Sequence, residues 1–236
     1  MENKIRTGSK ILDKALNGGY EKGIITTIYG PAGSGKTILA MLAVITTARN
    51  KKNIIYIDTE SSFSTERLKQ IAKDYKKILE KIFFFKPVNF EEQKKVFEKI
   101  KKIIENKNSN IGLIVIDTIS MLYRLELVKK KDASEVNKAL VEQISYISEI
   151  AKKKNLPVIV TNQVYSVFDE RDQVNMVGGD ILKYRSKTLI ELQITPSGNR
   201  KAILRKHRSL PYKEIVFKIV EGGIIGTKES KGFSFF

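Results

Sequence analysis

The sequence has 236 residues with 42% hydrophobic content, no cysteine and one histidine. Its 43 Lys and Arg against 26 Asp and Glu give a formal net charge of +17. This composition excludes disulfides, thiolate metal sites and a multi-histidine metal centre. The positive charge puts nucleic acid first among possible partners, although a lysine-rich solvated surface explains the excess nearly as well.

Length and apolar content favour one large domain, which we assign to residues 1–236. The N-terminus lacks the charged-then-apolar pattern of a leader, and no apolar run approaches the roughly 20 residues of a membrane span. We therefore expect a cytoplasmic protein with no membrane partner.

Helices and continuously apolar strands alternate along the chain up to residue 161. Helices are expected at 8–19, 37–49, 65–79, 91–105 and 133–154, and strands at 24–29, 54–58, 82–85, 113–117 and 157–161. This alternation predicts an α/β fold with a mostly parallel sheet flanked by helices. The tail differs, because strands at 187–194, 200–206 and 214–220 are separated by short turns. They predict antiparallel strands at the C-terminal edge of the sheet.

A glycine-rich loop separates the first long strand from the following helix. It matches the phosphate-binding pattern G-x-x-x-x-G-K-[ST] and consists of Gly30, Pro31, Ala32, Gly33, Ser34, Gly35, Lys36 and Thr37. Backbone amides of such a loop wrap phosphates, the lysine reaches the terminal phosphates, and the threonine hydroxyl is offered to Mg²⁺. The loop predicts a site for ATP and Mg²⁺.

A magnesium-bound triphosphate also needs a carboxylate at the end of a neighbouring strand. Asp117 closes one apolar run, while Asp58 closes another and Glu60 follows two residues later. Two strand-end acids thus compete for one metal role. A helix N-cap or a surface ion pair remains open for either.

Several strings resemble motifs of the archaeal and eukaryotic RecA-like recombinases over nearly the whole chain. They lie at 7–13, 18–19, 56–60, 63, 65–68, 122–124 and 161–164. The resemblance implies a RecA-like P-loop ATPase core. It also implies that Glu60 activates the attacking water, Asp117 holds the magnesium shell, Arg67 stacks on adenine, and Gln163 reports the γ-phosphate.

Departures from that family narrow the resemblance to its core-only archaeal paralogues. The chain begins six residues before the first motif at Thr7, so we expect neither an N-terminal helical DNA-binding domain nor a Phe-x-x-Ala polymerisation peptide. The loop after Gln163 also looks shorter than the second DNA-binding loop of these recombinases. This implies an accessory protein of homologous recombination and DNA repair that assists a full-length recombinase. We expect a weak DNA-dependent ATPase, with homo-oligomers possible but no long self-filaments.

The triplet Lys206-His207-Arg208 resembles one that these paralogues share with KaiC-type ATPases. There it faces the γ-phosphate of a neighbouring subunit, so Lys206 and Arg208 are candidate catalytic cations. We interpret His207 as a spacer that resists protonation between two cations. A solvated basic end of an edge strand remains the alternative.

Two loops are candidates for contacting single-stranded DNA with little sequence preference. The first follows Leu122, and the second spans Tyr165 to Val177, where nearby acids weaken the case. Their basic residues are Arg124, Lys129, Lys130, Lys131 and Arg171. Two other functions stay open: a self-sufficient strand-exchange recombinase, and a KaiC-like regulatory hexamer.

Overall fold

The computed structural model describes residues 3–129, 133–166, 174–176 and 179–227. Within these ranges ten strands form one sheet in the order β12-β11-β10-β9-β3-β7-β6-β4-β5, with β8 (Val174–Met176) paired to β7. A separate two-stranded sheet joins β1 (Lys4–Ile5) to β2 (Tyr20–Glu21). The predicted mostly parallel sheet with antiparallel C-terminal strands is confirmed.

The parallel half of the sheet is buried on both faces, as its continuous β-branched runs predict. Its strands are β3 (Ile25–Gly30), β4 (Asn53–Asp58), β5 (Ile82–Phe85), β6 (Ile111–Asp117) and β7 (Val158–Ser166). The register aligns their carboxyl ends, because Gly30 pairs with Gln163 and Asp58 pairs with Asp117. Polar residues that close different strands are thereby brought to one edge.

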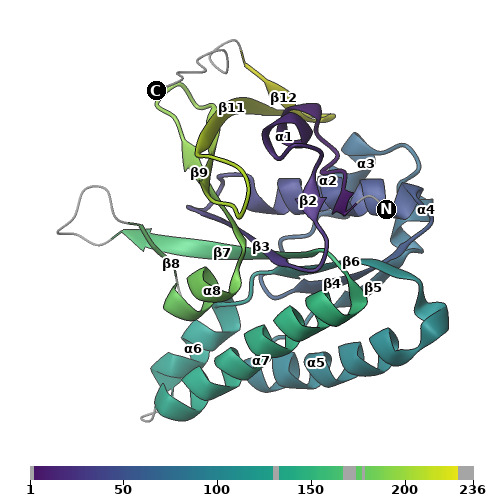
Figure 1. Cartoon of the computed structure of the whole chain (residues 1–236), viewed down its shortest axis with the longest axis vertical. Helices are drawn as coiled ribbons and strands as arrows, with labels where there is room; N and C mark the ends of the chain where they lie inside the picture. Colours follow the sequence, from purple (N-terminus) through teal and green to yellow (C-terminus); the bar gives the residue numbers. More distant parts are fainter. Residues whose placement is uncertain (1–2, 130–132, 167–173, 177–178, 228–236) are drawn as a thin grey trace.

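Helices cover both faces of the sheet (Figure 1). One face carries α1 (Lys10–Ala15), α2 (Lys36–Arg49), α3 (Thr65–Ile71) and α4 (Tyr75–Leu79). The other carries α5 (Phe90–Glu105), α6 (Met121–Lys129), α7 (Ala133–Lys154) and α8 (Gly179–Arg185). A single 3₁₀ turn, Lys107–Ser109, precedes β6. In the described ranges, every helix is too short or too polar to cross a membrane.

Two predicted helices are wrong in their length, and the one expected over 8–19 spans only Lys10–Ala15. The helix expected over 65–79 ends at Ile71 and restarts at Tyr75, since Ala72 has an extended backbone. The break places Asp74 beside α2, where its carboxylate accepts hydrogen bonds from Arg49 at 2.6 and 3.1 Å. The pairing between the two helices thus accompanies an interruption that helix propensity alone does not predict.

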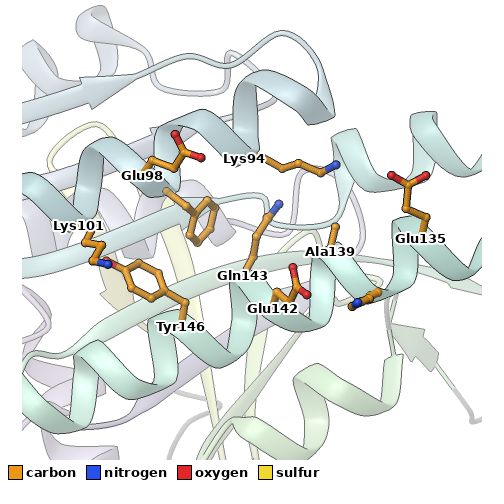
Figure 2. A pocket seen from close by; sticks show the side chains of 10 residues that line it. Lys94, Glu98, Lys101, Glu135, Ala139, Glu142, Gln143 and Tyr146 are labelled. Carbon is orange, nitrogen blue, oxygen red and sulfur yellow. The ribbon is translucent and has the colours of Figure 1, made fainter.

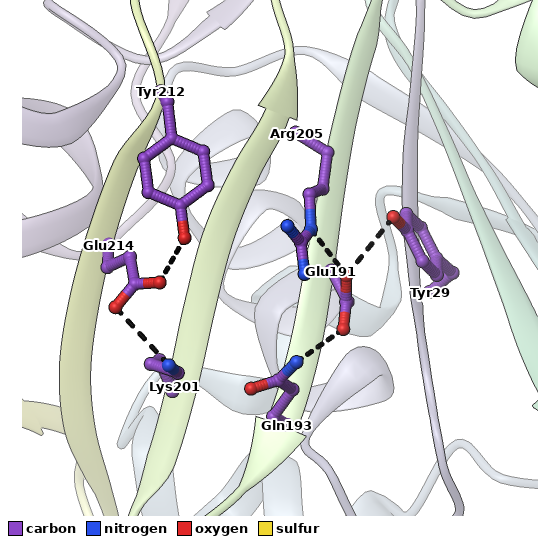
Figure 3. Close-up of polar contacts among 7 residues, drawn as sticks. All are labelled: Tyr29, Glu191, Gln193, Lys201, Arg205, Tyr212 and Glu214. Carbon is purple, nitrogen blue, oxygen red and sulfur yellow. Dashed lines mark hydrogen bonds and ion pairs between the residues drawn. The ribbon is translucent and has the colours of Figure 1, made fainter. Parts of the chain in front are cut away.

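The C-terminal strands extend the sheet from β3. They are β9 (Thr188–Ile194), β10 (Arg200–Lys206), β11 (Lys213–Val220) and the unpredicted β12 (Gly223–Gly226). β10 lies between β9 and β11, so the expectation that Lys206 ends an edge strand is wrong. On one face Glu191 accepts hydrogen bonds from Arg205 and Gln193 at 2.6 Å each and from Tyr29 at 3.4 Å (Figure 3). These contacts tie β10 to β3 through β9.

Candidate functional site

Glycines are required at two positions of the loop between β3 and α2. A side-chain Cβ at Gly30 would lie 2.3 Å from the carbonyl oxygen of Leu192 on β9. Gly35, immediately before α2, has φ +103°, a left-handed conformation that favours glycine. The loop therefore starts α2 with its backbone amides turned toward the end of the sheet.

Lys36 is the cation of this loop, and its residue is only 7% exposed. Its Nζ donates hydrogen bonds to the carbonyl oxygens of Gly30 and Pro31, at 2.9 Å each. Burial lowers the pKa of Lys36, while the nearby charges of Glu60 and Asp117 oppose that shift. Carbonyl partners hold the ammonium without neutralising it, so it can exchange them for a phosphate.

Asp117, at the end of β6, accepts hydrogen bonds from four hydroxyl groups. Its Oδ2 lies 2.9 Å from the hydroxyls of Thr37, Tyr56 and Ser62, and its Oδ1 accepts from Thr161. Burial and then the charge of Asp117 raise the pKa of Tyr56 well above its usual value, so this phenol remains a donor. The carboxylate is fixed directly beside the hydroxyl of the phosphate-binding loop.

Asp58 has a different role in the geometry. Its carboxylate accepts from the backbone amides of Ser62 at 3.0 Å and Phe63 at 3.1 Å. These bonds shape the segment between β4 and α3. Of the two competing strand-end acids, only Asp117 contacts Thr37, while Asp58 folds the loop that carries Glu60.

Glu60 and Gln163 meet although Glu60 follows β4 and Gln163 lies on β7. The amide nitrogen of Gln163 donates to both carboxylate oxygens of Glu60, at 2.9 and 3.0 Å. The hydroxyl of Thr118 also donates to Glu60, at 3.0 Å. These three hydrogen bonds fix the Glu60 carboxylate at the same end of the sheet as Lys36 and Thr37.

These side chains border a cleft of about 330 Å³. Arg67 also lines it, and its guanidinium donates to the carbonyl oxygens of Val220 at 2.5 Å and Glu221 at 3.1 Å. Arg67 therefore holds the turn between β11 and β12 beside the cleft. The side chain of Ile219, just before that turn, would lie 3.1 Å from a Cβ atom added to Gly35.

Sequence reasoning missed several polar groups of this site. Tyr56 and Thr161 lie within the motifs named above but have no predicted role, and neither has Ser62. Arg200, at the start of β10, donates to the carbonyl oxygen of Gly33 at 3.2 Å. A hydroxyl residue near the end of a buried strand was the available signal for Thr161, whereas nothing local marks Arg200.

The two cations of the Lys206-His207-Arg208 triplet contact different elements. Lys206 donates to the carbonyl oxygen of Lys183 on α8 at 2.8 Å, and Arg208 pairs with Glu21 at 2.9 Å. Neither lines the cleft beside Lys36. The pKa of His207 is lowered chiefly by burial, and Arg208 is a smaller cause.

The candidate DNA residues are only partly placed. Arg124 and Lys129 are exposed on helix α6, so the loop predicted there is wrong. The second predicted loop begins as a hairpin, because β7 continues to Ser166 and pairs with β8. Both features leave the carboxyl end of the sheet. Lys130, Lys131 and Arg171 lie outside the described residues.

Metal binding here would depend on ligands from the nucleotide. Among the described residues, no three His, Cys, Asp or Glu side chains lie together as a metal site. Mg²⁺ is commonly held by one or two carboxylates together with substrate phosphates and water. The pair of Thr37 and Asp117 fits that donor set.

Comparisons with known proteins agree with this geometry. The family model described as Rad51 matches residues 3–227. A protein of Methanobrevibacter smithii named DNA repair and recombination protein RadB is 41% identical over 228 residues, covering 94% of this chain and 96% of the relative. RadB of Methanococcus maripaludis strain C5 is 42% identical, covering 91% and 96%. RadB of Methanothermobacter thermautotrophicus is 36% identical, covering 95% and 97%.

Proposed function

The chain belongs to the Rad51 family, and from this membership we propose an ATP-binding, DNA-binding accessory protein that assists or regulates a full-length recombinase. Its relatives are named DNA repair and recombination protein RadB, which supports a role in repair and recombination. The observation that carries the ATP-dependent part is the meeting of Lys36, Thr37, Asp117, Glu60 and Gln163 at one end of the sheet. We further propose that this domain works in the cytoplasm.

Thr37 and Asp117 are proposed to hold Mg²⁺ with the nucleotide phosphates. The bound ion would supply positive charge that stabilises charge developing on the phosphates. Asp117 already accepts four hydroxyl hydrogen bonds, which leaves it little capacity for direct coordination. Asp117 would therefore hold the ion in its hydrated form, consistent with the reluctance of Mg²⁺ to dehydrate.

Glu60 is proposed to take a proton from the attacking water. Gln163 is proposed to control when the carboxylate of Glu60 is available for this step. Both oxygens of Glu60 accept from Gln163, so this contact occupies the oxygens that would take the proton. Movement of Gln163 toward a γ-phosphate releases Glu60. Gln163 lies on β7, which pairs with β8 in the second candidate DNA-binding segment. The same movement would therefore also displace that segment.

The proposed DNA surface includes the exposed side of α6. Arg124 and Lys129 are exposed there, beside the exposed apolar side chains of Leu125 and Val128. Cations of this kind track phosphates without reading sequence. Single-stranded DNA with little sequence preference is therefore the expected ligand.

Salt-dependent binding tests this surface. The logarithm of the binding constant for single-stranded DNA should fall linearly with log salt, at about −0.7 per phosphate contacted. Arg124→Gln/Lys129→Gln should flatten the slope by up to about 1.4. Lys76→Gln/Lys77→Gln on α4 is the control with the same charge change. Equal slopes in both variants would place the DNA surface elsewhere, and absent binding at low salt would remove the DNA role.

Lys206 and Arg208 are proposed to act in trans on a neighbouring ATPase core, either a second copy or a recombinase. They lie outside the nucleotide cleft of their own chain, as cations that stabilise a neighbour's γ-phosphate charge must. Long self-filaments are not expected. The KaiC-like hexamer shares this triplet, but the Rad51 match across residues 3–227 favours the recombination role.

Mixing two inactive variants tests the trans role. Lys206→Ala/Arg208→Ala and Lys36→Ala should each hydrolyse ATP poorly alone and recover partial activity together. Lys206→Ala alone is the milder companion, since Arg208 also pairs with the buried Glu21. Full activity of the double variant alone, or an inactive mixture that nevertheless co-assembles, would contradict action in trans.

A further inference from the structure

A second cleft, larger than the nucleotide cleft, lies at the opposite end of the sheet. It has a volume of about 650 Å³ and is bordered by the segments that precede β3, β4 and β7 and by the start of β6. The C-terminal ends of α2 and α7 also line it. We call it the basic cleft because its charged lining residues are Lys4, Arg6, Lys22, Lys52 and Lys154.

The charge of the basic cleft is one-sided. None of its lining residues, all from the described part of the chain, is an aspartate or a glutamate. The groove between α5 and α7, of about 560 Å³, is a useful comparison (Figure 2). Three lysines and three glutamates line that groove, so its charges balance. A generally lysine-rich surface therefore does not by itself explain the basic cleft.

Two of the cations are held in place by neutral groups. Lys4 donates to the carbonyl oxygens of Leu16 at 2.8 Å and Asn17 at 3.1 Å. Lys52 donates to the side-chain oxygen of Asn110 at 2.6 Å. These partners orient the ammonium groups but leave their charge intact. Lys154 forms no ion pair with a described residue. Arg6 lies 3.8 Å from the carboxylate of Asp13.

A buried hydroxyl supplies an independent observation. Thr47 lines the basic cleft and is 4% exposed, yet its Oγ1 has no hydrogen-bond partner among the described residues. Its neighbour Thr46 instead donates to the carbonyl oxygen of Leu42 at 3.0 Å. A buried hydroxyl without a hydrogen-bond partner is unfavourable, because it has lost its hydration without compensation. An acceptor oxygen arriving from the cleft would satisfy it.

Helix capping explains only part of the charge. Lysines near helix C-termini offset the partial negative charge of the helix dipole, and this accounts for Lys154 on α7. Lys22 lies in the turn after β2, and Lys52 lies immediately before β4, so both are outside the helices. Their convergence on the same cleft remains unexplained by capping.

We propose that the basic cleft binds the phosphodiester backbone of DNA, as a second contact at the end of the sheet opposite the nucleotide cleft. The inference rests on the proposed function only for DNA as the polyanion. Because none of the lining residues in the described chain is aromatic, the cleft contacts phosphates without base stacking. It therefore accepts both single strands and duplexes.

Salt titrations of DNA binding test the basic cleft. A labelled single strand and a duplex of the same sequence are titrated with the intact chain and with Lys52→Gln/Lys154→Gln. Lys95→Gln/Lys99→Gln on α5 is the matched control, because both lysines are exposed and lie outside both clefts. The cleft variant should flatten the slope by about 0.9 per lost contact on duplex DNA and about 0.7 on single strands. The control should retain its slope.

The remaining arms separate the possible outcomes. Lys154→Gln alone tests the cleft without removing a hydrogen bond and should flatten the slope by one contact. If the cleft and control variants have equal slopes while the intact chain binds DNA, the inference is wrong and the proposed function stands. If the intact chain does not bind DNA at low salt, both are wrong. Inorganic phosphate is titrated at constant ionic strength, and loss of phosphate binding with unchanged DNA slopes would assign a small-anion site instead.

Discussion

The two ends of the central sheet carry polar residues of different kinds. At the carboxyl ends Asp58, Asp117 and Glu60 are each held by specific hydrogen bonds. At the amino ends five cations converge with no carboxylate among the described lining residues. Specific hydrogen bonds fix the polar side chains at the first end, whereas an excess of positive charge distinguishes the second. Substitutions at the first should have large, specific effects, while those at the second should have small, salt-dependent ones.

Glu60→Gln should produce the largest change. Removing a general base lowers the rate by about 10²–10⁴-fold, while ATP affinity should be retained because Lys36 and Thr37 are unchanged. Single-turnover hydrolysis and direct ATP titration measure the two effects. Glu66→Gln, on the exposed side of α3, should have neither effect. Loss of ATP binding in Glu60→Gln, or hydrolysis at the parental rate, would refute this division of roles.

Lys36→Ala should remove most ATP binding. Losing one partner of a desolvated charge pair costs about 2–5 kcal/mol, or roughly 30- to 5,000-fold in affinity. Lys154→Ala at the other end is the crossed control, since it should leave ATP affinity unchanged and reduce the salt slope of DNA binding. Calorimetric ATP titration of both variants decides the point. Equal losses of ATP affinity would mean that the two ends do not act separately.

Tyr56→Phe should destabilise the protein by removing a hydrogen bond at the carboxyl ends of the strands. Its hydroxyl donates to buried Asp117 at 2.9 Å, and hydrogen bonds to charged groups contribute about 1.5–3 kcal/mol. Urea denaturation should show this loss in the free energy of unfolding. Tyr75→Phe, whose hydroxyl has no hydrogen bond to a described residue, should change it little. Equal stability of the two variants would contradict the proposed contribution of the Asp117 network.

Thr47→Val should have the smallest effect and the opposite sign. It replaces a buried unpaired hydroxyl by a methyl group of similar shape, so the free energy of unfolding should rise by about 1 kcal/mol. Thr46→Val is the matched control, since it removes the bond to Leu42 and should not stabilise. Urea denaturation of both variants provides the comparison. A destabilised Thr47→Val would show that this hydroxyl has a partner in solution.

Contiguous patterns predicted most of the fold and part of the nucleotide site. The loop of residues 30–37 could be predicted as a phosphate-binding loop because its glycines, lysine and threonine lie on one short segment. The alternation of apolar strands with helices predicted the parallel sheet, since burial on both faces requires continuous apolar runs. The secondary-structure prediction was wrong where tertiary contacts decide the conformation, namely at the break after Ile71 and in helices α6 and α8.

The sequence by itself determined which residue types close each strand, but only the tertiary structure decided which of them meet. Asp58 and Asp117 follow similar apolar runs, yet strand register and the loop after β4 place only Asp117 beside Thr37. The contact between Glu60 and Gln163 joins residues 103 positions apart. The basic cleft likewise gathers cations from separate segments between Lys4 and Lys154. Such contacts depend on strand order and register, which local propensity does not encode.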